Sequence, residues 1–202
     1  MKEARKNSVS HLADLYNVII GVALTLAVNN IIDTSAQGLP LRIGIAVNLL
    51  AFLVLVIPFY HGAVRHLFAT YVENGGSTRI KSGALLADFV LLFVEGCLFV
   101  MIALLIGATE KMAWATVALL VLDSVWGFLA WLAFTGAHAQ FAEKRWALIN
   151  CVTAVAVSVL LIFGEQTFHN NLRMAQWGIV AVLTLRTIID YVSCWDFYFP
   201  EA

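Results

Sequence analysis

Charged side chains are scarce in this sequence: Asp, Glu, Lys and Arg make up 12% of its 202 residues, about half the share in a soluble globular domain. The net charge is −1, so no strongly basic surface suggests nucleic-acid binding. The three cysteines lie in apolar runs, which indicates packing and not a disulfide framework. Zinc-site spacings, phosphate-binding loops and hydrolase motifs are missing. We therefore expect no metal, no cofactor and no enzymatic activity.

Apolar residues, by contrast, make up 61% of the chain. A helix that crosses a bilayer needs about 20 mostly apolar residues. Six stretches meet this requirement: 14–33, 43–66, 83–107, 112–136, 146–164 and 174–197. The runs are continuous and do not alternate with polar residues, which favours helices over the strands of a membrane barrel. We predict an all-α fold, a polytopic transmembrane helix bundle with about six spans.

The segments between the apolar stretches are short. Residues 33–40 and 73–79 have the Gly, Pro, Asn, Asp and Ser content of loops. Residues 107–111 predict a tight turn, which would make the third and fourth spans an antiparallel pair. No cleavage site precedes the first span, so we expect this span to be retained. Residues 1–202 are therefore predicted to form a single transmembrane domain.

The distribution of Lys and Arg predicts the orientation, because cytoplasmic loops are enriched in both residues. An N-terminus in the cytoplasm places seven of them on that side: Lys2, Arg5, Lys6, Arg79, Lys81, Lys144 and Arg145. Three fall on the other side: Arg42, Lys111 and Arg173. Four tryptophans near span ends fit an aromatic belt: Trp114, Trp146, Trp177 and Trp195. We expect both termini in the cytoplasm and a multi-pass protein of the inner or plasma membrane.

Five ionisable residues fall inside predicted spans: Asp88, Glu95, Asp123, Arg186 and Asp190. Glu95, Asp123 and Arg186 each lie about twelve residues into a span, which is near the bilayer centre. Asp88 shares a helix face with Glu95, and Asp190 can pair with Arg186 one turn away. Four acids against one base cannot all stay charged in a dry site. The group is either a proton or cation pathway or a structural network that joins the helices.

The second span ends with a basic cluster, His61, Arg65 and His66. The two histidines lie five residues apart, about 140° around a helix, so they do not readily share one metal ion. Arg65 can extend its charge toward the lipid headgroups. We interpret the cluster as part of the cytoplasmic interface.

A stripe of small and polar residues runs along the first span at three- and four-residue steps. It consists of Asn17, Gly21, Thr25, Val28 and Asn29. Small residues at this spacing let membrane helices approach closely. The same stripe can instead line an aqueous pore.

The first two spans remotely resemble the endolysosomal potassium channels and their short six-helix bacterial relatives. Residues 23–28, Ala-Leu-Thr-Leu-Ala-Val, match a run in the first helix of that family, and residues 59–61 and 66–68 match the aromatic-His and Leu-Phe ending of its second helix. The Arg, Phe, Ser and Asp of the family signature are replaced here by His11, Leu15, Tyr16 and Asn17. The resemblance implies a cytoplasmic N-terminus and a tetramer around the first helix.

Three functions remain open from the sequence. The first is an oligomeric ion channel, with cations favoured over anions and the first span lining the pore. The second is a small proton- or ion-coupled transporter that uses the intramembrane acids and Arg186. The third is a non-transporting anchor or sensor subunit for a partner protein. The expected partners are the lipid bilayer, further copies of the chain, and an inorganic cation or proton.

Overall fold

The chain forms six long helices in the computed structural model, which describes residues 2–32, 42–73, 82–133, 139–167 and 172–200. They are α1 (Lys2–Ile31), α2 (Ile43–Phe68), α3 (Ser82–Leu104), α4 (Thr109–Ala133), α5 (Ala139–Thr167) and α6 (Leu172–Ser193). A π-helical turn, η1 (Ala69–Glu73), continues α2, and a short helix, α7 (Trp195–Tyr198), follows α6. The described residues contain no β-strand, so the all-helical prediction is confirmed. Most of the predicted loops 33–40 and 73–79, with Arg79 and Lys81, lies outside the described residues.

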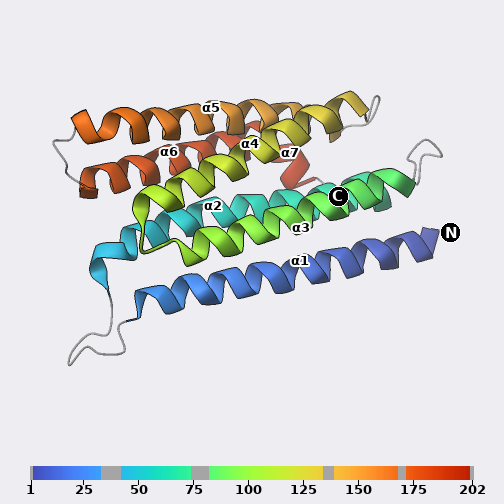
Figure 1. Cartoon of the computed structure of the whole chain (residues 1–202). Helices are drawn as coiled ribbons and strands as arrows, with labels where there is room; N and C mark the ends of the chain where they lie inside the picture. Colours follow the sequence, from blue (N-terminus) through green and yellow to red (C-terminus); the bar gives the residue numbers. More distant parts are fainter. Residues whose placement is uncertain (1, 33–41, 74–81, 134–138, 168–171, 201–202) are drawn as a thin grey trace.

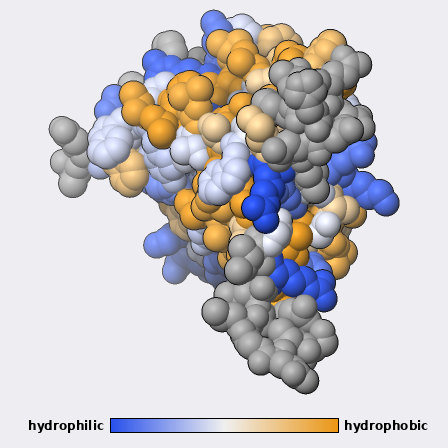
Figure 2. Space-filling view, turned by 90° about the vertical axis from the view of Figure 1, so that its left-hand side faces the viewer, coloured by the Kyte–Doolittle hydropathy of each residue, from blue (hydrophilic) through white to orange (hydrophobic). Residues whose placement is uncertain are grey.

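All six helices are long and apolar enough to cross a membrane, which confirms a multi-pass membrane protein. Large apolar side chains such as Val18, Phe93, Leu148 and Val192 are exposed on the outside of the bundle. In water such a surface would be unfavourable, whereas in lipid it matches the solvent. The end of the bundle near the α3–α4 turn shows hydrophilic residues among hydrophobic ones (Figure 2), as expected where helices reach the headgroups.

The axes of the long helices are roughly aligned with one another, and both termini lie toward the same end of the bundle (Figure 1). The main pairs are α4 with α5, α1 with α3, α2 with α6, and α5 with α6. Phe52, Phe59 and Phe99 join α2 to α3 through edge-to-face ring contacts with centroids 5.7 and 6.3 Å apart, an arrangement that aromatic quadrupoles favour. This aromatic core adjoins the polar cavity described below, which Phe59 also lines.

Side chains from neighbouring helices satisfy the carbonyl groups at the end of α3. Asn30 Nδ2 donates to Ala103 O at 3.0 Å, and Asn48 Nδ2 donates to Ile106 O at 2.7 Å. The last carbonyls of a helix lack partners within it, and such groups are costly to bury in a bilayer. The two asparagines therefore fix the α3–α4 turn against α1 and α2.

Several helix ends differ from the hydropathy limits. α1 begins at Lys2 and α5 at Ala139, earlier than the predicted residues 14 and 146. Hydropathy marks the apolar run, and a helix can continue beyond it into the headgroup region. The sixth span was predicted to reach residue 197, but α6 ends at Ser193 because Cys194 leaves the helical conformation (φ −115°, ψ 25°).

The close approach of α4 and α5 depends on a glycine. A Cβ on Gly127 would lie 3.0 Å from Glu143 O and 3.3 Å from Ala147 Cβ. We expect Gly127→Ala to lower the free energy of unfolding by about 1–3 kcal/mol, as overpacking typically does. Thermal unfolding in detergent measures this, with Gly44→Ala as the control because its Cβ would meet nothing within 4 Å. Equal melting temperatures for the two variants would contradict the packing argument.

Candidate functional site

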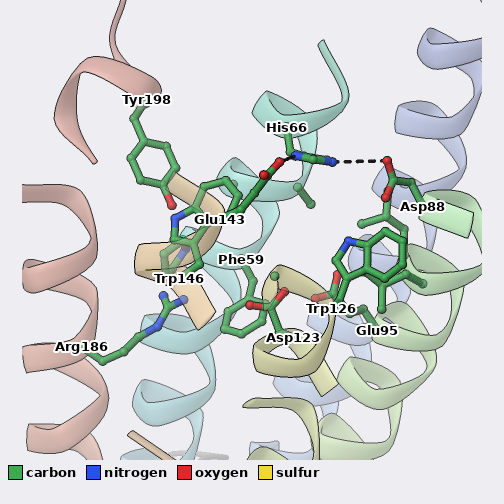
Figure 3. A pocket seen from close by; sticks show the side chains of 16 residues that line it. Phe59, His66, Asp88, Glu95, Asp123, Trp126, Glu143, Trp146, Arg186 and Tyr198 are labelled. Atoms are coloured by element: carbon green, nitrogen blue, oxygen red, sulfur yellow. Dashed lines mark hydrogen bonds and ion pairs between the residues drawn. The ribbon is translucent and has the colours of Figure 1, made fainter. Parts of the chain in front are cut away.

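A polar cavity lies between α2, α3, α4, α5 and α6 and is closed on one side by α7 (Figure 3). It has about 50 Å³ of water-accessible space. Since one water needs about 10–15 Å³ by this measure, three to five waters fit. The charged or titratable residues in its lining are His66, Asp88, Glu95, Asp123, Glu143, Arg186 and Tyr198. Apolar and aromatic side chains, including Phe59, Trp126 and Trp146, form the remainder of the wall.

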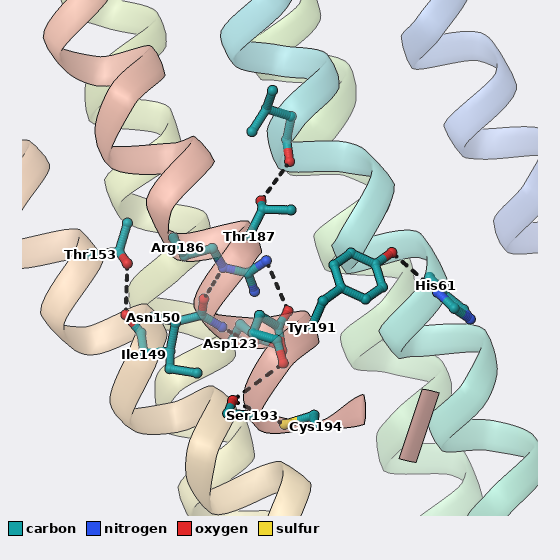
Figure 4. Close-up of polar contacts among 12 residues, drawn as sticks. His61, Asp123, Ile149, Asn150, Thr153, Arg186, Thr187, Tyr191, Ser193 and Cys194 are labelled. Carbon is teal, nitrogen blue, oxygen red and sulfur yellow. Dashed lines mark hydrogen bonds and ion pairs between the residues drawn. The ribbon is translucent and has the colours of Figure 1, made fainter. Parts of the chain in front are cut away.

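Arg186 organises the deeper part of the cavity (Figure 4). Its Nε donates to Asn150 Oδ1 at 2.9 Å, and the Asn150 amide donates in turn to Asp123. Arg186 Nη1 lies 3.2 Å from Asp190 Oδ2, one turn along α6. The guanidinium also lies over the Phe59 ring, 4.7 Å from its centroid, a cation–π contact that strengthens when desolvated. Arg186 therefore links α2, α4, α5 and α6.

Glu95 and Asp123 both line the cavity, and their carboxyl groups lie close enough to share a hydrogen bond when one of them is protonated. Two ionised carboxylates have only acceptors, so this bond requires a proton on one of the two groups. Glu95 is buried, whereas Asp123 is partly buried. The sequence predicted these two acids and Arg186 at one depth, and the structure places them side by side.

Asp88 belongs to a second cluster, which lies two helical turns from Glu95. His66 is held between two acids: its Nε2 lies 3.3 Å from Asp88 Oδ2, and its Nδ1 lies 3.1 Å from Glu143 Oε1. Tyr71 Oη donates to Asp88 Oδ2 at 2.5 Å. The sequence predicted an interfacial His66, but the residue is buried inside the bundle. The helix continues past His66 through η1 to Glu73, and the interfacial placement of His66 stays a prediction.

The acids around the cavity outnumber the bases. Five carboxyl groups (Asp88, Glu95, Asp123, Glu143 and Asp190) face one guanidinium, Arg186, and one imidazole, His66. If every group were charged, three negative charges would lack a counter-charge within these two clusters. A low-dielectric interior does not tolerate such an imbalance, so protons, water or cations must compensate it.

His61 and Arg65 hold the C-terminal helix α7 against the end of the bundle. His61 Nδ1 lies 3.2 Å from Tyr191 Oη, and its ring contacts those of Tyr198 and Phe199. Arg65 Nε donates to Phe197 O at 2.8 Å. These two residues thus lie at the end of the bundle, where the sequence placed them, and they fasten the segment that closes the cavity.

Tyr198 is the residue of α7 that reaches the cavity wall. Its Oη donates to Asp190 Oδ2 at 3.0 Å. Burial, together with the neighbouring Asp190 carboxylate, raises the pKa of Tyr198 above its ordinary value. The hydroxyl therefore stays protonated and remains a donor across the physiological pH range.

Removing this hydroxyl gives a direct test of how α7 is attached. We expect Tyr198→Phe to lower the free energy of unfolding by about 1.5–3 kcal/mol, the value of a hydrogen bond to a charged group. Tyr60→Phe is the matched control, because Tyr60 stacks on Tyr16 with a centroid distance of 6.1 Å and is only partly buried. Denaturant or thermal unfolding in detergent provides the measurement. A larger loss for Tyr60→Phe would contradict the assignment.

The stripe on α1 lies outside the cavity. Asn17, Gly21, Thr25, Val28 and Asn29 are all exposed on the outer face of the helix. Thr25 Oγ1 donates to Gly21 O at 2.8 Å, within the same helix. The stripe therefore faces away from the other helices of this chain.

Four members of the two clusters were not among the predicted site residues: Asn150, Glu143, Tyr71 and Tyr198. A sequence signal exists for the first two. Glu143 and Asn150 are seven residues apart on α5, as Asp88 and Glu95 are on α3, which puts each pair on one helix face. No local pattern indicates Tyr198, because it reaches the cavity only when α7 folds back. Trp146, predicted for the aromatic belt, also lines the cavity.

Comparison with known proteins adds no relative. No protein-family model, curated protein or solved structure matches this chain. The resemblance of the first two spans to potassium channels therefore stays a prediction. The features that bear on function are the acidic cavity and the exposed stripe of α1.

Proposed function

We propose that the protein is a membrane transporter that moves protons through the cavity, with Glu95 and Asp123 as its central proton-binding pair. The observation that carries this proposal is the close approach of two carboxyl groups inside a cavity with room for water. A carboxyl pair that shares one proton can release it or take up a second with little movement of the chain. A water molecule beside the pair can accept the proton that the pair releases and can donate the second proton that the pair takes up.

The surroundings of the pair support this role. Arg186 offsets one negative charge, and its guanidinium is fixed by Asn150, Asp190 and Phe59. The amide of Asn150 donates to Asp123 and so favours the form in which Asp123 accepts. Intramembrane ionisable residues that face a cavity commonly mark a proton pathway. A purely structural network would favour paired charges, whereas these clusters leave acids in excess.

The Lys and Arg bias supports an orientation with the α7 end of the bundle in the cytoplasm. Arg5, Lys6, Lys144 and Arg145 lie on the helix segments at this end. We therefore propose that the cavity lies closer to the cytoplasmic side, behind α7.

Proton flux into proteoliposomes tests the function. Purified protein is reconstituted in vesicles with an internal pH dye, and a potassium diffusion potential drives protons inward. We expect acidification well above that of protein-free vesicles, and its direction should reverse with the potential. Acidification at the protein-free rate, under both a potential and a pH gradient, would rule out the proposal.

The exposed face of α1 supports a second candidate, an oligomeric cation channel lined by α1. Asn17, Thr25 and Asn29 present polar groups on a surface that contacts no other helix of the chain. Polar side chains gain from facing water or a second copy rather than lipid. Disulfide crosslinking of a Gly21→Cys variant in native membranes distinguishes this candidate. Crosslinked copies together with potassium flux would support it, and a monomer without potassium flux would exclude it.

A further inference from the structure

The polar residues of the cavity occupy two layers. Asp88 and Glu95 are seven residues apart on α3, and Glu143 and Asn150 are seven apart on α5. Seven residues correspond to about 10.5 Å along a helix. One layer holds His66, Asp88 and Glu143, and the other holds Glu95, Asp123 and Arg186. Figure 3 shows the two layers on opposite sides of the same cavity.

The contacts of His66 bear on the number of protons in its layer. Both ring nitrogens lie within 3.3 Å of carboxyl oxygens, one from α3 and one from α5. An ionised carboxylate can only accept, and a neutral imidazole donates from one nitrogen only. Both contacts are hydrogen bonds only if His66 carries two ring protons or one acid is protonated. A second ring proton would let His66 form an ion pair with both acids, so the layer can hold one proton beyond those of a neutral imidazole.

Buried carboxyl oxygens next to His66 provide a place where cavity water can accept a proton. Asp88 Oδ1 and both carboxyl oxygens of Glu143 have no hydrogen-bond partner within the described part of the chain, although Glu143 Oε1 lies 3.1 Å from His66 Nδ1. Asp88 is 1% exposed and Glu143 is 2% exposed, and both residues line the cavity. Burying such an oxygen without a partner costs about 1–3 kcal/mol or more. A water in the cavity removes this cost and contacts the oxygen through which a proton can leave.

The size of the cavity matches the gap between the layers. Hydrogen-bonded oxygens are about 2.8 Å apart, so three waters between two carboxyl groups span about 11 Å. The layers are separated by about 10.5 Å, and the cavity accommodates three to five waters at about 10–15 Å³ each. A chain of waters of this length therefore connects the layers without any movement of the helices.

We infer that His66, Asp88 and Glu143 form a second proton-binding site, in series with Glu95 and Asp123 and joined to them by cavity water. This inference rests on the proposed function. In the transfer step, the N–H bond at His66 Nε2 breaks as an O–H bond forms on Asp88, which leaves a neutral imidazole and a neutral carboxyl. Asp88 then releases a proton to the first water, and each water passes one proton on toward Glu95.

The other groups around His66 come from three elements. Thr70 Oγ1 lies 3.4 Å from His66 Nδ1, and Tyr71 donates to Asp88. The Trp146 ring on α5 lies edge-on to the imidazole at 6.5 Å. Arg5 of α1 interacts electrostatically with Tyr71. Asp88 and Glu143 are charged groups in direct contact with the imidazole, and Glu95 interacts with it electrostatically.

Replacing His66 by asparagine tests the second site in the full-length protein. Asparagine keeps a donor and an acceptor but cannot take up a proton. We expect proton flux in proteoliposomes to fall about tenfold or more. His11→Asn is the matched control, because His11 is exposed on α1, and it should behave as the wild type.

A second variant separates proton transfer from a role in holding the helices. His66→Ala should lose flux and regain it with added imidazole, but not with pyrazole, a ring of the same size that does not protonate near neutral pH. Recovery with both rings, or with neither, would overturn the inference. So would wild-type flux in His66→Asn alongside loss of flux in Asp123→Asn, although the proposed function would then stand. Absence of flux in the wild type would overturn both.

Discussion

Replacing Arg186 by methionine is expected to lower the free energy of unfolding by about 3–5 kcal/mol, the usual cost of removing one partner of a buried ion pair. Arg186 is 4% exposed and Asp190 is 0% exposed. Loss of the Arg186 guanidinium would remove the counter-charge that faces the Asp190 carboxylate. It would also remove the donor that Asn150 Oδ1 accepts from. Thermal and denaturant unfolding of the detergent-solubilised protein would measure the change.

The double variant Arg186→Met/Asp190→Asn provides the decisive control for this prediction. Removing both charges eliminates the uncompensated carboxylate, and Tyr198 can still donate to the oxygen of an asparagine at this position. We therefore expect the double variant to regain most of the lost stability, since replacing a whole buried pair is often close to neutral. A double variant less stable than Arg186→Met would contradict the claim that an uncompensated Asp190 carboxylate destabilises the single variant.

Asp123→Asn should lower proton flux about 100-fold while the protein still folds, because asparagine cannot exchange a proton with Glu95. The side chain keeps its size, and an amide can still hydrogen-bond to Glu95 and Asn150. Flux in proteoliposomes and the melting temperature are measured on the same preparation. Asp14→Asn is the matched control, because Asp14 is exposed on α1, and it should retain wild-type flux.

The two measurements together separate a proton pathway from a structural network. Loss of flux with a melting temperature near that of the wild type supports the pathway. Loss of folding in Asp123→Asn, with no difference in flux per folded molecule, would instead show that the acids hold the helices together.

Hydropathy and helix geometry predicted the bundle and the central cluster well, for a simple reason. Each span crosses the same thickness of lipid, so residues near the middle of different spans share one depth. Glu95, Asp123 and Arg186 met this condition and lie together. The spacing of Asp88 and Glu95 likewise put both on the face that lines the cavity.

The His66 layer was harder to predict because it depends on where helices end. The apolar run of the second span stops near His66, whereas the helix continues through η1 to Glu73. Glu143 precedes the apolar run of α5 but lies within the helix, and it is 2% exposed. Hydropathy treats both residues as interfacial, since it does not register polar side chains that are buried by partners from other helices.

The closure of the cavity by α7 could not be predicted from local sequence either. It depends on the break at Cys194 and on contacts between residues more than 100 positions apart, such as Arg65 with Phe197. From the sequence, Trp195 was expected in an aromatic belt at a span end. The structure shows that other rings of α7 pack over His61 and Trp146.

The ratio of proton flux between the wild type and the Glu95→Gln/Asp123→Asn variant tests the central claim most directly. Both proteins are reconstituted at equal amounts of folded protein and driven by the same potential. If the carboxyl pair is the proton-binding site, the ratio should be about 100 or more. A ratio near one, with clear flux in the wild type, would show that protons cross the protein elsewhere and would contradict the account.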